Sequence, residues 1–424
     1  MTNRSPDALD TNSEPKRGGS FIPDGRAENA DSSRKMAMDR YKTKPLDGIT
    51  VLDFSSLLPG PMCSLLLAES GAQVIKIERP GQGDEMRSYK PAAGRDSANF
   101  ILLNRGKSSI TLDLKSIEDR QRALSLIETA DVLIEQFRPG VMARLGLSYE
   151  SVREVNPRII YCSISGYGQS GPARDLAAHD LNYMARSGLL SLTGDSSGNP
   201  NIPCALIADI AAGAYPAVMN ILLAIQQRTR SGEGVWLDIA MGENLLPMIY
   251  WALGEGELTG RFPGISDALV TGGSARYQIY RTADDRFLSV APIEERFWQN
   301  FCEVIDLPVA YRDDAVDPAQ TQKAVARIIS SKPLSNWLEA FMHKDVCVQV
   351  VHSVGEARQD PHFIHRGVLY PSHPVFGTHR AQRIIPADNS TIVKDQKTRP
   401  SLHLRITGPA RLINSLKLPL AGLV

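Results

Sequence analysis

The chain has 424 residues, 42% hydrophobic and 22% charged, which is enough material for two or three domains of an ordinary globular protein. Lys+Arg and Asp+Glu each number 47, and the resulting zero net charge gives no support for a nucleic acid or an anionic membrane as partner. The five cysteines are odd in number and lack CxxC spacing, which argues against a metal site or a disulfide framework and for a cytoplasmic protein.

No stretch reaches the roughly 18 continuous apolar residues that a membrane span needs, and the nearest candidate, 210–225, predicts a buried helix. The first 45 residues are polar, mixed in charge and without the apolar core of a signal peptide. They predict a disordered N-terminal extension, residues 1–45.

Residues 46–240 predict a large Rossmann-like α/β domain. Short β-branched runs alternate with helical patterns, and such alternation implies right-handed crossovers and a parallel sheet. The turn after the first run, DFSSLLPGPMC, lacks the GxGxxG that seats a dinucleotide, so NAD and FAD are not indicated. The predicted strands are 49–55, 73–78, 108–114, 131–137, 159–165 and 234–240.

A linker helix is expected within 241–264 and a smaller α+β domain over 265–370. Residues 276–293 predict a hairpin around Ala283 to Asp285, followed by two or three helices up to about residue 343. The remaining segment, 371–424, is expected to return to the large domain.

His179 and Asp209 are the first candidates for catalysis. His179, in AAHDLNY, is the only histidine among the first 342 residues, and Asp209, in IADIAAG, precedes a long apolar stretch. A neutral imidazole and a carboxylate suit proton transfer near pH 7. A structural role is open for both, with Asp209 as a helix N-cap. At a helix N-terminus, Asp209 would also lie near N–H donors that stabilise an enolate.

Glu294, in VAPIEERFW, follows an apolar strand. It is either a solvated carboxylate at a helix start or a partner that holds His179 in one tautomer. Several basic residues, among them Arg79, Lys115, Arg138 and Arg144, follow the ends of predicted parallel strands. Each alone is an ordinary surface charge, but together they lie where phosphates bind such sheets.

The strings LDGITVLDFSSLLPGPMC, NRGKSSITLDLKS, ADVLIEQFRPGVMARLGL, SGYGQSGP, AHDLNY and ADIAAG occur in an order that resembles the family III CoA-transferases (CaiB/BaiF type). The resemblance runs from about residue 46 to about residue 370. It implies an acyl-CoA substrate, an interlocked homodimer and no cofactor beyond the coenzyme A that the substrate carries. The family includes α-methylacyl-CoA racemases as well as transferases.

The resemblance implies catalytic roles for His179, Asp209 and Glu294. Two positions depart from the racemase pattern, since Ala178 replaces a glycine and Glu295 replaces a proline. The residues that it implies for binding CoA or the acyl group are Arg79, Leu112, Asp113, Leu114, Lys115, Gln136, Phe137, Arg138, Arg144, Ala178, Asp180, Leu181, Asn182 and Tyr183.

Three functions follow from these residues. The presence of His179, Asp209 and Glu294 together favours an acyl-CoA 2-epimerase that works through an enolate. A CoA-transferase would instead use Asp209 as a nucleophile and form a mixed anhydride. A non-catalytic acyl-CoA binder would need only the basic residues, and the intact acid–base pair argues against it.

Overall fold

The computed structural model describes residues 44–195 and 197–366. The predicted extension at 1–45, apart from its last two residues, and the predicted C-terminal segment at 371–424 lie outside these ranges. The fold is α/β, with a six-stranded parallel sheet and a separate three-stranded antiparallel sheet.

The parallel sheet confirms the predicted architecture. Its strand order is β5-β2-β1-β6-β7-β8, and every neighbouring pair is parallel. The strands are β1 (Thr50–Asp53), β2 (Gln73–Glu78), β5 (Ser108–Thr111), β6 (Val132–Glu135), β7 (Ile160–Ser165) and β8 (Val235–Ala240).

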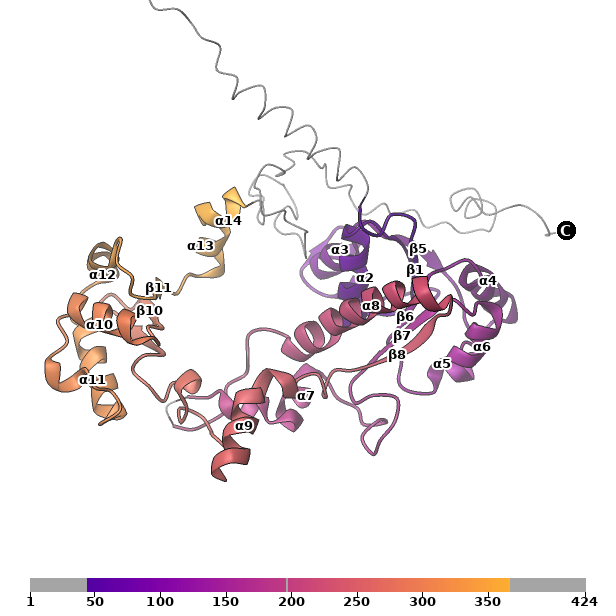
Figure 1. Cartoon of the computed structure of the whole chain (residues 1–424). Coiled ribbons are helices and arrows are strands. Elements are labelled where there is room, and N and C mark those ends of the chain that lie inside the picture. Colours follow the sequence, from indigo (N-terminus) through magenta and orange to yellow (C-terminus); the bar gives the residue numbers. More distant parts are fainter. Residues whose placement is uncertain (1–43, 196, 367–424) are drawn as a thin grey trace, which may run out of the picture. The chain divides into compact units, whose positions relative to one another are not determined.

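Helices cover both faces of this sheet (Figure 1). On one face, α2 (Pro59–Glu69) and α8 (Tyr215–Ser231) pack on β1, β6 and β7 in one apolar cluster. On the other face, α4 (Ile117–Ile127) and α6 (Tyr149–Val155) form a second cluster. Burial on both sides explains why the inner strands are continuous apolar runs instead of alternating patterns.

Short elements that the sequence patterns did not predict complete this part of the chain. They are brief and lack a full period of apolar residues, so they leave little signal. They comprise η1 (Glu85–Ser88), β3 (Ala92–Ala93), β4 (Asp96–Ser97), α3 (Ala98–Asn104), α5 (Val141–Arg144), α7 (Asp180–Ser187) and η2 (Leu189–Leu192).

Asp209 lies in a seven-residue π-helix, η3 (Ala208–Ala214), that runs directly into α8. The N-cap of η3 is Ile207, so the prediction that Asp209 is a helix N-cap is wrong. The reason is that Ile207 already has helical backbone angles, which moves the start of the helix ahead of Asp209.

The helix formed by η3 and α8 was predicted to be buried, which is confirmed for one face and wrong for the other. Ala217, Ile221 and Ala224 are buried, whereas Met219 and Leu223 are 61% and 66% exposed. By length and composition alone, the helix over Ala208–Ser231 is a candidate membrane span, although 39% of its most apolar window is buried in the fold.

The second half of the described chain has its own core. A 3-10 turn, η4 (Leu246–Ile249), and α9 (Tyr250–Thr259) lead to the predicted hairpin, which is confirmed as β9 (Gln278–Arg281) and β10 (Phe287–Val290). A third strand, β11 (Val348–Val350), joins β10. The other elements are η5 (Leu269–Thr271), α10 (Glu295–Val304), η6 (Val309–Tyr311), α11 (Pro318–Ile329), α12 (Leu334–Phe341), α13 (Val354–Arg358) and α14 (Pro361–His365).

Candidate active site

The carboxyl edge of the parallel sheet gathers three of the predicted binding segments. Arg79 follows β2, Leu112–Lys115 follow β5 and Gln136–Arg138 follow β6, so all three leave the sheet at the same edge. Between β1 and β6 the strand order reverses direction, and ligands of open α/β sheets bind in the crevice at such a point.

A hydrogen bond crosses this reversal point. The backbone N–H of Gly60, just after β1, donates to Oε1 of Gln136, just after β6, over 2.9 Å. A Cβ at position 60 would lie 2.9 Å from that oxygen and 2.2 Å from the side chain of Ser55. Only glycine therefore allows the turn after β1 to approach the segment after β6 this closely.

Glu135, which the sequence patterns did not single out, fixes the segment after β6. Its Oε2 accepts a 2.8 Å hydrogen bond from the backbone N–H of Phe137. Burial raises the pKa of Glu135 to about 7 and Asp238 adds to the rise, although hydrogen bonds from Ser163 and Phe137 oppose it. The signal that could have found it is the acid that ends the otherwise apolar strand VLIE.

The predicted basic residues differ in how they are engaged. Arg79 pairs with Glu85 at 2.7 Å, and all four side chains, those of Arg79, Lys115, Arg138 and Arg144, are exposed. The three predicted binding residues before Lys115 differ in how far they can reach a ligand. The side chain of Leu112 is buried in the core, Leu114 packs against it, and the Asp113 carboxylate accepts the N–H of Lys115 at 3.1 Å.

Asp180, the residue after His179, contacts Asp209. The N–H of His179 donates to Asn182 Oδ1 over 3.0 Å, which fixes the first turn of α7. Asp180, the next residue, is buried, and its Oδ1 accepts a 2.9 Å hydrogen bond from the backbone N–H of Asp209. A hydrogen bond thus ties Asp209 directly to the neighbour of an exposed histidine, across 29 positions of sequence.

This arrangement changes the protonation of Asp209. Burial of its carboxyl group, and then the negative charge of Asp180, raise the pKa of Asp209 to about 7. The group therefore exchanges protons near neutral pH, where an ordinary aspartate would stay ionised. The N–H of Asp209 is occupied by Asp180, so the prediction that it serves a developing enolate is wrong for this donor.

Tyr183 connects Asp209 with the segment after β6. Its hydroxyl donates to the carbonyl of Ala178 over 2.8 Å. Burial and the charge of Asp209 raise the pKa of Tyr183 to about 12, while Arg138 acts in the opposite direction. The charge of the predicted acid–base residue and that of the predicted CoA segment therefore both act on the same phenol. The two remaining predicted residues of α7, Leu181 and Asn182, are exposed.

Glu294 lies at the N-cap of α10, in the part of the chain built around the antiparallel sheet, and is exposed. Its support of His179 stays a prediction. Its neighbour Glu295, where the racemase pattern has proline, is held by Arg276 at 2.8 Å. Arg276 also binds Asp314 at 2.8 Å, so the extra charge at position 295 is part of a local ion-pair cluster.

The doubly wound parallel sheet is an architecture shared by many α/β enzymes, which bind their ligands at the carboxyl edge. The model of CoA-transferase family III matches residues 46–403, and the chain belongs to this family. The match extends beyond residue 370, where the resemblance in the sequence was expected to end.

Named relatives carry two kinds of activity. The chain is 35% identical over 334 residues to α-methylacyl-CoA racemase of Homo sapiens, covering 77% of this chain and 83% of the relative. It is 33% identical over 350 residues to acetyl-CoA:oxalate CoA-transferase of Acetobacter aceti, covering 78% and 88%. A solved CAIB/BAIF family protein from Brucella suis is 27% identical with a TM-score of 0.70, over 82% of this chain and 94% of that protein.

Proposed function

We propose that the protein is an α-methylacyl-CoA racemase, an acyl-CoA 2-epimerase. The observation that carries this proposal is the carboxyl group of Asp209, whose pKa is raised to about 7 and whose backbone is bonded to the residue after His179. A general acid or base works best when its pKa lies near the operating pH. Family membership supplies the acyl-CoA substrate class.

In the proposed reaction, His179 removes the α-proton of a 2-methylacyl thioester from one face. The resulting enolate then takes a proton from Asp209 on the opposite face, which inverts the configuration. In the reverse direction the two residues exchange roles. Glu294 holds the imidazole of His179, the segments at 112–115 and 136–138 bind coenzyme A, and the reaction needs no cofactor beyond the coenzyme A of the substrate.

A CoA-transferase is the second candidate, because relatives with transferase names match the chain at almost the same identity as racemases. In that reaction the Asp209 carboxylate attacks the thioester, the C–S bond breaks, and a mixed anhydride and free coenzyme A form. The raised pKa of Asp209 favours the racemase, since a carboxyl group that is half protonated near pH 7 is a poorer nucleophile.

The two candidates differ in their dependence on His179 and on trapping by hydroxylamine. In a racemase, His179→Ala lowers epimerisation by about 10²–10⁴-fold and hydroxylamine traps no acyl group on Asp209. In a transferase, the same variant keeps transfer to a carboxylic acid and hydroxylamine modifies Asp209. Mass spectrometry of the protein after incubation with acyl-CoA distinguishes the outcomes, and trapped Asp209 would contradict the racemase.

We also propose that the protein works as a cytoplasmic homodimer. The outward face of α8, formed by Met219, Leu222 and Leu223, is apolar and exposed in the single chain. Exposed apolar patches of this kind commonly mark protein interfaces. Sedimentation of the full chain without detergent tests this proposal, and a soluble monomer or a requirement for detergent would contradict it.

A further inference from the structure

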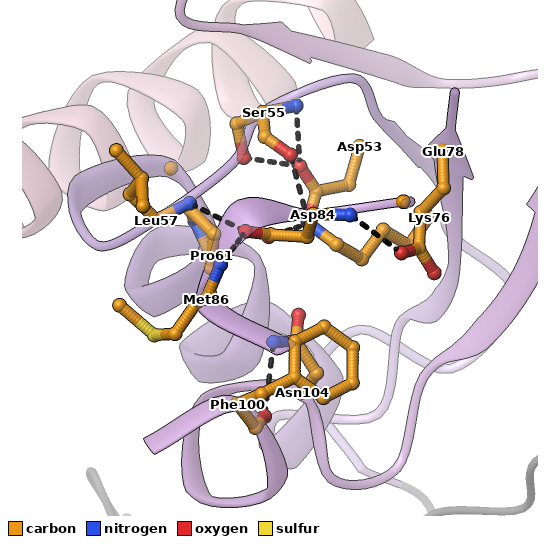
Figure 2. A network of polar contacts seen from close by, with 12 residues as sticks. Asp53, Ser55, Leu57, Pro61, Lys76, Glu78, Asp84, Met86, Phe100 and Asn104 are labelled. Atoms are coloured by element: carbon orange, nitrogen blue, oxygen red, sulfur yellow. Dashed lines mark hydrogen bonds and ion pairs between the residues drawn. The ribbon is translucent and has the colours of Figure 1, made fainter. Parts of the chain in front are cut away.

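A cluster of buried charges lies behind the turn that follows β1, outside the residues assigned to the reaction. Asp53, Lys76, Asp84 and Lys107 are all at most 5% exposed. Lys76 Nζ lies 2.9 Å from Asp84 Oδ2, and Lys107 Nζ lies 3.3 Å from Asp53 Oδ2. Figure 2 shows how Asp53, Lys76 and Asp84 converge beneath the turn.

Such a cluster is a costly way to fill a core. Removing charges from water is unfavourable, and apolar residues of similar volume often serve stability equally well. The two lysines of this cluster also donate hydrogen bonds to backbone carbonyl groups near the turn. Lys107 Nζ donates to the carbonyl of Pro61 over 2.8 Å, and Lys76 Nζ donates to the carbonyl of Ser55 over 2.8 Å.

Asp84 makes the contact that fixes the conformation of the turn. Its Oδ1 accepts hydrogen bonds from the N–H of Leu57 at 3.1 Å and from the N–H of Met86 at 2.9 Å (Figure 2). Leu57 has a φ of 63°, in the left-handed region that side chains other than glycine seldom adopt. A strained residue of this kind persists only where its surroundings hold it, and such residues concentrate at functional sites.

The turn held by Asp84 contacts both sides of the candidate active site. On one side, the N–H of Gly60 bonds to Gln136 in the predicted CoA segment at 2.9 Å. On the other side, Pro59 packs on Gly213 of η3, where an added Cβ would lie 3.2 Å from the Pro59 Cβ. The helix η3 also carries Asp209, so a shift of the turn would change the distance between the two sides.

We propose that Asp84 is a positioning residue for the reaction. By accepting the N–H of Leu57, it holds the turn at 55–60 in the conformation that sets the acyl thioester against Asp209. This inference rests on the proposed function, because it takes an acyl-CoA as the bound substrate. Because the proposed function assigns coenzyme A to residues 112–115 and 136–138, we expect the loss of Asp84 to affect the chemical step more than binding.

The test compares Asp84→Ala and Asp84→Asn with Asp96→Ala in the full chain. Asp96 is also buried and pairs with Arg87 at 2.7 Å, and neither residue belongs to the turn at 55–60. We expect Asp84→Ala to lower kcat about 10²-fold with KM within about threefold of wild type, since small misplacements cost this much. Asp84→Asn keeps an acceptor for Leu57 but turns its amide N–H groups toward Lys76, so we expect it to recover most, though not all, of the lost kcat.

Hydrogen–deuterium exchange of the peptide that contains residues 55–60 provides a readout independent of activity. Exchange in this peptide should accelerate in Asp84→Ala and stay near wild type in Asp84→Asn and Asp96→Ala. Unchanged exchange, equal kcat losses in the two alanine variants, or no rescue by asparagine would overturn the proposal. If wild type turns over no acyl-CoA but the exchange pattern appears, the proposed function fails while the turn is still held as described.

Discussion

Asp53 and Asp209 are both substantially buried, yet their surroundings drive their protonation in opposite directions. Burial opposes ionisation of Asp53, but Lys76 and Lys107 outweigh it and lower the pKa of Asp53 to about 2. Burial and the neighbouring Asp180 together raise the pKa of Asp209 to about 7. The sign of the nearest charges, more than the degree of burial, separates a permanently ionised aspartate from one that can exchange a proton.

The comparison also separates two uses of an aspartate. Asp53 accepts hydrogen bonds from Ser55 and Ser64 and so ties the end of β1 to α2. Asp209 has a like-charged neighbour in Asp180, an arrangement that lowers stability and is retained where function requires it. Three of the four predictions below change one side of this comparison at a time, and the fourth tests Glu135, another buried acid with a raised pKa.

The largest effect is expected for Asp209→Asn, which should lower α-proton exchange by about 10⁴-fold, at the upper end for a positioned acid or base.

The same Asp209→Asn variant should be more stable than wild type at pH 8. A carboxyl whose folded pKa exceeds its unfolded value loses stability as pH rises from about 3.8 to about 7, and asparagine removes that loss. Urea unfolding at pH 5 and pH 8 measures this. Asp53→Asn is the control and should lose stability, and a loss of activity below tenfold in Asp209→Asn would contradict the account.

Lys76→Met should cost about 3–5 kcal/mol of unfolding free energy, because it leaves Asp53 and Asp84 buried without their shared cation. Urea denaturation at pH 7 measures this cost. Lys323→Met removes an exposed lysine from α11 and should change stability by less than about 0.5 kcal/mol. Equal effects of the two variants would mean that the ion pairing of Lys76 contributes no measurable stability.

The sequence predicted the parallel sheet well because each of its strands is a short apolar β-branched run between turn residues, which can be recognised locally. The contacts of the candidate active site were harder to predict. The helical backbone of Ile207 places Asp209 in the first turn of η3 instead of at its N-cap, and no sequence pattern marks that shift. The contact of Asp180 with Asp209 could not be predicted, because the two residues are 29 positions apart in the sequence.

The buried cluster was missed for a related reason. Lys76 stands in the strand QVIKIE, where a lysine normally indicates a solvent-facing position. Once both faces of β2 are covered, the same lysine must be buried and needs an acid partner. Asp84, eight positions later in a turn, is this acid partner. Hydrophobic periodicity does not predict a pairing between a strand residue and a turn residue.

Glu135→Gln tests whether the segment after β6 is held by a protonated acid. The folded pKa of Glu135, about 7, lies above its ordinary value, so stability should fall as pH rises from about 4.5 to about 7. Glutamine keeps the acceptor for the N–H of Phe137 but cannot ionise, so this part of the pH dependence should disappear. Thermal unfolding between pH 4.5 and pH 8 measures it, and an unchanged slope would contradict the assignment.

The smallest effect is expected for Asp180→Asn. Asparagine can still accept the N–H of Asp209, but the like charge is lost, so the pKa of Asp209 should fall part of the way toward its ordinary value. Burial, the larger cause, remains. The limb of the pH–rate profile that reports Asp209 should move to lower pH with little loss of maximal rate. A shift to higher pH would show that Asp180 does not act on Asp209 through its charge.

The central claim is that Asp209 and His179 move a proton at the carbon next to the thioester, and NMR of a 2-methylacyl-CoA in D₂O tests it most directly. With wild-type protein and no carboxylic acid present, the account predicts that the α-proton signal disappears and the methyl doublet collapses as deuterium enters. Retention of the α-proton, together with CoA transfer once a free acid is added, would contradict it.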